Sequence, residues 1–176
     1  IHISGDGTLN IKSDISLITG HGGIYIDNTT VNTVGTANYY NVTTFERNIE
    51  ITDSTVTIDS LGGGLQCYDE KLDIYITGSH VTIDVNAECI VSKRDDVEGC
   101  LFVQDSYLNL RNNAFNIIDA DFYCSDNLTV LASTNRNGTN AVTYNPANLS
   151  SYKWIEATRK VISYIDVVDI DVPETT

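Results

Sequence analysis

The sequence predicts an all-β protein that winds as a parallel β-helix, or solenoid, of about six coils with a β cap at its C-terminal end. Three observations in the 176 residues predict this fold. Two short alternating segments recur as a pair along the chain, the pairs begin at nearly equal spacing, and no segment between them has room for a crossover helix. Each pair therefore reads as part of one solenoid coil.

The repeat consists of an apolar-x-apolar segment, a short polar break and a second apolar-x-apolar segment. Strict alternation over four to five residues indicates a strand, so each copy holds two strands. Three copies align without a gap, at 49–58, 74–83 and 101–110, and weaker copies begin at residues 1, 24 and 122. An antiparallel sandwich is the alternative, but its successive strand pairs have no need to resemble each other.

Four positions in each copy are expected to point inward and to stack on the same positions of the next coil. In the copy at 49–58 they are Ile49, Ile51, Val56 and Ile58. The first inward position of the second strand should form a buried column, which consists of Val56, Val81 and Leu108.

The polar breaks are expected at a corner of the coil, because Asp, Asn and Gly tolerate left-handed backbone angles and bond neighbouring amides. The breaks of the three gapless copies are Asp53-Ser54, Gly78-Ser79 and Asp105-Ser106. A third strand per coil is expected near Leu65–Cys67, Cys89–Val91 and Phe115–Ile117.

The C-terminal part does not fit the repeat. We expect residues 1–135 to form the parallel β-helix and residues 136–176 to form a cap and a linker toward a further module. In this part, 144–151 reads as a loop, while 152–157 and 161–168 read as two strands that would cover the open edge of the solenoid. The chain contains no Met. It starts inside an alternating segment, so we expect a piece of a longer surface protein with flanking domains.

Acidic residues outnumber basic residues 24 to 10, which gives a net charge of −14. This charge argues against nucleic-acid binding, which needs clustered Lys and Arg, and against an anionic membrane surface. No apolar run approaches the length that spans a bilayer, so we expect no membrane insertion. The many Asn, Ser and Thr residues are typical of an extracellular β protein.

The copies at 49–58 and 74–83 read Ile-x-Ile-x-[Asp/Gly]-Ser-x-Val-Thr-Ile. They resemble the right-handed parallel β-helix modules of Gram-positive surface proteins, and in particular the clostridial β-helix carbohydrate-binding domain family. The resemblance covers about residues 1–135. It implies a right-handed solenoid that binds plant polysaccharide, with calcium in some members. The Asp-Gly-Ile segments usual in that family are replaced by Gly62-Gly63-Gly64-Leu65 alone, and the four cysteines are not typical, so no binding residue is carried over.

The second position of each copy points outward and is often aromatic. Read from coil to coil, the row is His2, Tyr25, Glu50, Tyr75, Phe102 and Tyr123. A row of rings can stack against the C–H faces of sugars, so Tyr25, Tyr75, Phe102 and Tyr123 are the predicted ligand-binding residues. His80 and Tyr107 could extend this surface. The alternatives are that sheets favour aromatic ladders for stability, or that another domain covers the row.

A second candidate site is acidic. Asp59 and Asp84 hold the same position after the second strand of their copies, with Arg111 at that position in the next. Two carboxylates one coil apart repel unless a cation lies between them, and Ca²⁺ suits such a pair. Asp59 and Asp84 are therefore the predicted metal site. The alternative is a solvated edge relieved by Arg111, and no other cofactor is expected.

An enzymatic reading rests on Gly20-His21-Gly22 and Asp95-Asp96, which resemble the motifs of β-helical pectin hydrolases. Those enzymes place carboxylates on both sides of the scissile bond as acid and base. In that family the Asp pair precedes the Gly-His-Gly, whereas the order here is reversed, and the family's Arg-x-Lys is absent. We therefore expect no catalytic residue and no enzymatic activity.

The four cysteines have spacings close to one coil, from Cys67 to Cys89 and from Cys100 to Cys124. Each pair could therefore stack in adjacent coils, and Cys89 with Cys100 is an alternative pair. The repeat register turns Cys124 inward and Cys100 outward, which argues against the second pair. Disulfides of a secreted protein and reduced thiols that fill the core both remain open.

Together these patterns predict a non-catalytic carbohydrate-binding or adhesion module of a bacterial cell-surface or secreted protein. Its partner would be a polysaccharide or other glycan, and its location would be extracellular or on the cell surface. One alternative is a structural spacer of an adhesin with no ligand of its own. The other is a pectin-type hydrolase or lyase.

Overall fold

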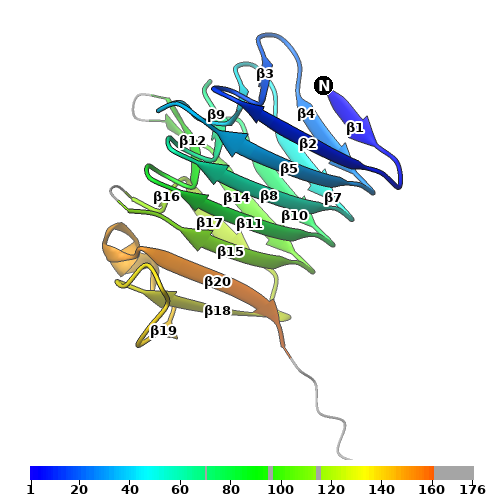
Figure 1. The fold of residues 1–176 in the computed structure, drawn as a ribbon. Coiled ribbons are helices and arrows are strands. Elements are labelled where there is room, and N and C mark those ends of the chain that lie inside the picture. The colour runs from blue at the N-terminus through cyan, green and yellow to red at the C-terminus, as the bar shows by residue number, and fades with distance from the viewer. Residues whose placement is uncertain (70, 95–96, 114–115, 161–176) are drawn as a thin grey trace, which may run out of the picture.

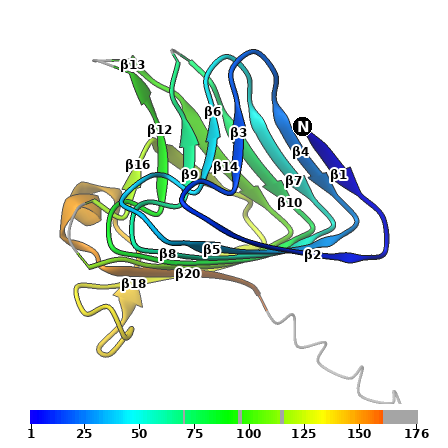
Figure 2. The same cartoon turned by 45° about the horizontal axis from the view of Figure 1, so that its top comes forward.

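A computed structural model describes residues 1–69, 71–94, 97–113 and 116–160. The chain winds as a parallel β-solenoid, which confirms the predicted fold class (Figure 1). Three sheets form the walls around one interior, as the turned view of Figure 2 shows. From coil to coil, the strands in front run leftward in Figure 1 and those behind run rightward, so the winding is right-handed.

The first wall, sheet A, holds the first strand of every repeat copy. Its six strands are parallel, and each pairs with its equivalent in the next coil. In spatial order they are β1 (His2–Ser4), β4 (Ile24–Asp27), β7 (Ile49–Thr52), β10 (Ile74–Thr77), β14 (Cys100–Gln104) and β17 (Asp121–Cys124).

Sheet B begins with the second strands of five copies, all parallel. They are β2 (Thr8–Ser13), β5 (Thr30–Gly35), β8 (Thr55–Ser60), β11 (His80–Val85) and β15 (Tyr107–Arg111). Three antiparallel strands extend the sheet beyond β15. In spatial order these are β20 (Trp154–Arg159), β18 (Leu128–Ser133) and β19 (Val142–Thr143).

Sheet C supplies the third strand of each coil. Its parallel strands are β3 (Leu17–Thr19), β6 (Val42–Thr44), β9 (Leu65–Cys67), β12 (Ile90–Arg94) and β16 (Ile118–Asp119). A short strand, β13 (Val97–Glu98), pairs antiparallel with β12. The predicted strand at Leu65–Cys67 is confirmed, and the one near Cys89–Val91 begins at Ile90. The last one, predicted near Phe115–Ile117, is β16, whose pairing with β12 starts at Ile118; Phe115 lies outside the described residues.

The predicted inward register is confirmed. Ile49, Ile51, Val56 and Ile58 are each at most 1% exposed, and Val81 pairs in register with Val56 on one side and with Leu108 on the other. Fully burying such a side chain contributes about 1.5–3 kcal/mol. The parallel pairing excludes the antiparallel sandwich.

The corner between sheets A and B has the predicted left-handed backbone. Asn28, Asp53 and Asp105 have φ of 47°, 47° and 49°, and Gly78 has φ of 61°. Glycine at this corner also makes room for the Asp53 carboxylate, because a Cβ on Gly78 would lie 2.2 Å from Asp53 Oδ1. The corner is therefore a turn repeated in each coil, as its Asp, Asn and Gly residues indicated.

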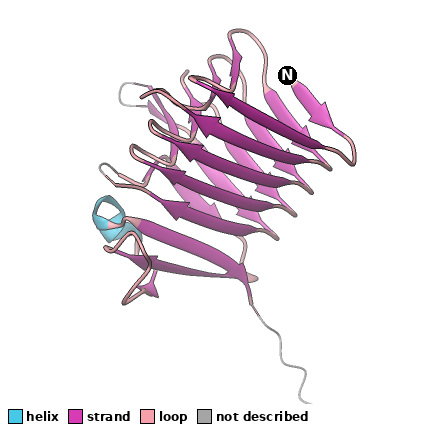
Figure 3. Ribbon diagram, viewed as in Figure 1, coloured by secondary structure: helices cyan, strands magenta, loops and turns pink. Residues whose placement is uncertain are grey.

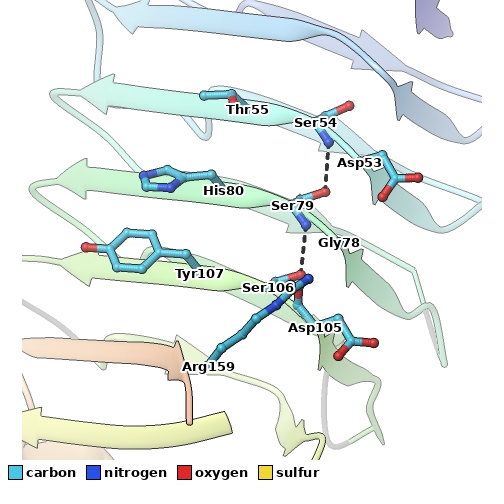
Figure 4. A pocket seen from close by; sticks show the side chains of 10 residues that line it. All are labelled: Asp53, Ser54, Thr55, Gly78, Ser79, His80, Asp105, Ser106, Tyr107 and Arg159. Atoms are coloured by element: carbon cyan, nitrogen blue, oxygen red, sulfur yellow. Dashed lines mark hydrogen bonds between the residues drawn. The ribbon is translucent and has the colours of Figure 1, made fainter. Parts of the chain in front are cut away.

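Buried serines, which follow the left-handed residues, join the coils at this corner. Ser79 Oγ accepts the Ser54 N–H at 3.1 Å, and Ser106 Oγ accepts the Ser79 N–H at 3.0 Å (Figure 4). The Ser79 hydroxyl in turn donates to the Thr77 carbonyl at 2.7 Å. This serine ladder satisfies backbone amides that the turn leaves without a strand partner.

We expect Ser79→Ala to lower the free energy of unfolding by about 1–3 kcal/mol, because the buried Ser54 N–H loses its acceptor. Urea unfolding followed by circular dichroism measures the change. Ser4→Ala, at an exposed position of β1, is the control and should stay within about 0.5 kcal/mol of the wild-type value. Equal stability of the two variants would show that the ladder contributes nothing.

The C-terminal region departs from the expected sixth coil. β17 stacks on β14, but the second strand of that copy, expected to continue the parallel stack from Leu128, is instead the antiparallel β18. The reason is that β20 occupies the edge of β15, so β18 pairs with β20 and not with β15.

The segment predicted as a strand from 152 is β20, beginning at Trp154, and the expected loop contains the 3-10 helix η1 (Pro146–Ser151) (Figure 3). The second predicted strand, 161–168, lies outside the described residues.

Candidate functional site

The outward row of sheet A has the predicted register. His2, Tyr25 and Glu50 are paired from coil to coil, and the row continues through Tyr75, Phe102 and Tyr123. Tyr25 is 38% exposed and Tyr123 is 52% exposed, while Tyr75 and Phe102 are half-buried. The structure thus brings all four predicted ligand-binding rings onto one face of the solenoid.

Three of these rings stack on one another. The ring centroids of Tyr75 and Phe102 lie 5.2 Å apart at an interplanar angle of 10°, and those of Phe102 and Tyr123 lie 5.4 Å apart at 18°. Each such pair contributes about 0.5–1.5 kcal/mol beyond its buried area. Because both faces of Phe102 are covered by its neighbours, this ring ladder presents edges to solvent, and only its outermost rings keep a face free.

The row is interrupted at Glu50, and a hollow of about 410 Å³ lies there, lined by His2, Tyr25, Asp27, Glu50 and Thr52 among others. Tyr25 meets His2 edge-on, with ring centroids 6.4 Å apart and an angle of 77°. A Cβ on Gly23 would lie 2.7 Å from the Tyr25 hydroxyl, so Gly23 makes the room in which this ring lies. The hollow therefore combines the Tyr25 and His2 rings with two carboxylates and a hydroxyl, a combination not inferred from the sequence.

Asp73 holds Tyr75 in place beside the hollow. The Tyr75 hydroxyl donates to Asp73 Oδ2 at 2.9 Å, and the Cys100 N–H donates to Asp73 Oδ1 at 2.8 Å. Desolvation raises the pKa of Tyr75, and the hydrogen bond to Asp73 and the charges of Asp73 and Glu50 raise it further. The Tyr75 phenol therefore stays neutral at physiological pH.

The predicted metal site is on the outer face of sheet B. Asp59 and Asp84 are neighbours in register, and Arg111 follows Asp84. The Asp84 carboxylate forms an ion pair with Arg136, a residue 52 positions away in the sequence that the pattern did not indicate. The described residues contain no group of three or more His, Cys, Asp or Glu that could hold a metal ion. Calcium binding at Asp59 and Asp84 stays a prediction. A calcium ion there would compete with the Arg136 guanidinium for the Asp84 carboxylate.

A second hollow, of about 490 Å³, follows the corner between sheets A and B (Figure 4). Asp53 and Asp105 line it across Gly78, and the stacked rings of His80 and Tyr107, with centroids 4.2 Å apart, line it on sheet B. At its end, Arg159 Nε donates to the Asp105 carbonyl at 3.0 Å. His80 and Tyr107 were anticipated as an extension of the surface, whereas Arg159 lies outside the repeat and no pattern indicated it.

Only the Gly20-His21-Gly22 half of the hydrolase pattern lies within the described residues. His21 is exposed, and its Nδ1 lies 2.7 Å from Glu46 Oε1. Asp95 and Asp96 lie outside the described residues. The hydrolase reading therefore stays an untested alternative.

All four cysteines are free thiols, and neither predicted pair is in register. Cys67 pairs with Ser92, while Cys124 pairs with Val103 and not with Cys100. The reason is that small differences in coil length shift the register by a few residues. Burial raises the pKa of Cys67 and of Cys124 to about 12, so these thiols stay protonated and unreactive.

The fold and the site together define a parallel β-solenoid with an exposed aromatic face. No family model matches the chain, and neither curated proteins nor solved structures give a match. The resemblance to the clostridial carbohydrate-binding domains thus stays a prediction. Among the described residues, no helix is long and apolar enough to cross a membrane.

Proposed function

We propose that this chain is a non-catalytic carbohydrate-binding and adhesion module of a cell-surface or secreted protein, which holds a glycan on the outer face of sheet A. The observation that carries the proposal is the hollow at Glu50, where the row of aromatic residues opens beside carboxylates. Its volume of about 410 Å³ lies within the usual range for ligand sites, about 300–1,000 Å³.

The residues of the hollow have the chemistry that a sugar ring needs. The C–H face of a pyranose can pack against the Tyr25 ring, because both surfaces are apolar and flat. Asp27 and Glu50 can accept hydrogen bonds from sugar hydroxyls, and the Thr52 hydroxyl can donate or accept. The edges of Tyr75 and Phe102 continue the surface along the solenoid, so a glycan chain would run from coil to coil.

The charge of the chain limits the class of glycan. At a net charge of −14, a polyanion such as polygalacturonate is repelled unless cations bridge it. A neutral or weakly charged polysaccharide has no such penalty. We therefore expect a non-acidic glycan, bound weakly at each site.

A glycan array with and without Ca²⁺ tests the proposal. We expect binding to neutral or weakly charged polysaccharides that does not need Ca²⁺, and a loss of about tenfold or more in Tyr25→Ala and in the double variant Tyr75→Ala/Phe102→Ala, because the packing surface is removed. Tyr39→Ala is the matched control, since Tyr39 is 58% exposed but lies outside sheet A. Thermal melting should show that all three variants stay folded.

Two results would contradict the proposal in different ways. Binding to a polyanion that disappears with a chelator would move the site to Asp59 and Asp84. Absence of binding to any glycan would favour the structural spacer. The stacking of Tyr75, Phe102 and Tyr123 is the observation that favours a spacer, because such a ladder stabilises coil-to-coil contacts without any ligand.

A further inference from the structure

We propose that the hollow at Glu50 selects glycans that carry free amino groups, so that the preferred ligand is a positively charged hexosamine polymer. This inference rests on the proposed carbohydrate-binding function and names the ligand class of the same site. It arises from the arrangement of charge around Tyr25.

Two carboxylates lie beside the Tyr25 ring. Asp27 follows Tyr25 by two residues on β4, so both side chains point outward from sheet A. Glu50 lies in register with Tyr25 on the neighbouring strand β7. Both carboxylates line the hollow, so a ligand group placed there faces two negative charges beside the rings of Tyr25 and His2.

No cation of the described part of the chain neutralises these two carboxylates by an ion pair. Three other surface acids, in contrast, form ion pairs with Lys or Arg: Asp84 with Arg136, and Glu98 and Asp119 with Lys93. The hollow is thus a place where a positive charge on the ligand would meet carboxylates that have no competing partner.

The ring adds a third attraction. An ammonium group over the face of a tyrosine ring is attracted by the negative face of the π system. A ligand with hydroxyls alone would satisfy the carboxylates as hydrogen-bond acceptors but would leave their charges unbalanced.

The preference for an amino group is expected at only one part of the outer face of sheet A. The fourth position of each strand also points outward, and from Asp27 it continues as Thr52, Thr77 and Gln104. Beyond the hollow, this row is therefore neutral through Gln104, and the ring row next to it is aromatic. A polymer would accordingly place one amino sugar at Glu50 and neutral contacts along the rest of its length.

Three hexasaccharides with the same β-1,4 backbone test this selection: the hexamers of glucosamine and N-acetylglucosamine, and cellohexaose. They differ at carbon 2, which carries an ammonium, an acetamido or a hydroxyl group. Calorimetry at pH 5.5 keeps the amines of the glucosamine hexamer protonated. We expect the glucosamine hexamer to bind about tenfold more tightly than the other two, and this ratio to fall toward one in 1 M NaCl.

His2 also lines the hollow, and a positive charge on its ring would oppose a ligand ammonium, so His2→Gln should not lower the ratio.

Variants that remove single charges test whether Glu50 and Asp27 cause the preference for the glucosamine hexamer. Glu50→Gln and Asp27→Asn, which keep the side-chain shape but remove one charge, should each lower the ratio to about threefold or less. Asp126→Asn is the matched control, because it removes the same charge from the exposed turn after β17, three strands away from β7 in sheet A, and should leave the ratio unchanged.

The outcomes separate the two proposals. Equal binding of the three hexamers, or a preference that Glu50→Gln does not lower, overturns the amine selection and leaves the carbohydrate-binding function standing. Absence of binding to all three also overturns the amine selection, and the glycan array then decides whether the carbohydrate-binding function stands. Tri-lysine bound as tightly as the glucosamine hexamer would show that charge alone is recognised, which also overturns selection of a glycan.

Discussion

Val81→Asp is expected to leave the chain unable to fold. Val81 has no exposed surface and packs between Val56 and Leu108 in the middle of the stack. An unpaired carboxylate placed there loses its hydration without gaining a partner, and such substitutions belong to the class that costs more than about 4–5 kcal/mol. Domains of this size have about 5–15 kcal/mol of stability in total. Because each coil contacts only its neighbours, damage in a central coil also separates the two halves of the solenoid.

Far-UV circular dichroism and the soluble fraction after expression measure this effect. The control is Thr55→Asp, an equivalent substitution at an exposed position of the neighbouring strand β8, which should stay folded. A soluble Val81→Asp protein with a cooperative thermal transition would contradict the inward register.

Ala157→Pro should release the cap and cause association between molecules. Ala157 has no exposed surface and is paired with Leu108 of β15 and Val130 of β18, so β20 is an internal strand of sheet B. Proline removes the backbone N–H that donates to the ladder and is not accommodated in the middle of a sheet. Loss of β20 exposes the edge of β15, and an unpaired edge is a template for pairing with another chain.

Size-exclusion chromatography with light scattering measures the association. Ala157→Gly, which keeps the N–H and should cost only about 0.5–1 kcal/mol, is the matched control and should stay monodisperse to the same degree as the wild-type chain. If Ala157→Pro eluted as the wild-type chain does and melted at the same temperature, β20 would not be what protects the edge.

The stack itself could be predicted because its cause is local and periodic. The two-residue alternation in 49–58, 74–83 and 101–110 fixes which side chains point inward, and equal spacing fixes which coils are neighbours. The third strands were harder to locate because several of them are only three residues long, as in β3 and β6, and so show little alternation. The antiparallel insertion of β20 depends on pairing between distant segments that share no repeat, so periodicity carries no information about it.

The candidate site on sheet A likewise has a part that the repeat predicts and a part that only the structure shows. The register alone brought Tyr25, Glu50 and Tyr75 into one row, which the repeat predicts. Whether rings offer faces or edges depends on side-chain angles, and these follow from packing such as that of Tyr25 over Gly23. The hollow at Glu50 could therefore be located only from the structure, although the interruption of the aromatic row at that residue is visible in the sequence.

The reversed direction of β20 also decides how a solenoid of this kind can change its length. A duplicated coil inserted between β8 and β11 would find a parallel neighbour on either side, whereas one added after β17 would have to displace an antiparallel strand. A solenoid of this kind can therefore gain coils more easily inside the stack than at its C-terminal end. Each coil inserted between β7 and β10 would move the Tyr75 ladder away from Glu50 by one strand separation, about 4.8 Å. The number of coils thus acts as a molecular ruler, which sets the distance between the charged contact and the aromatic contacts that one ligand chain must span.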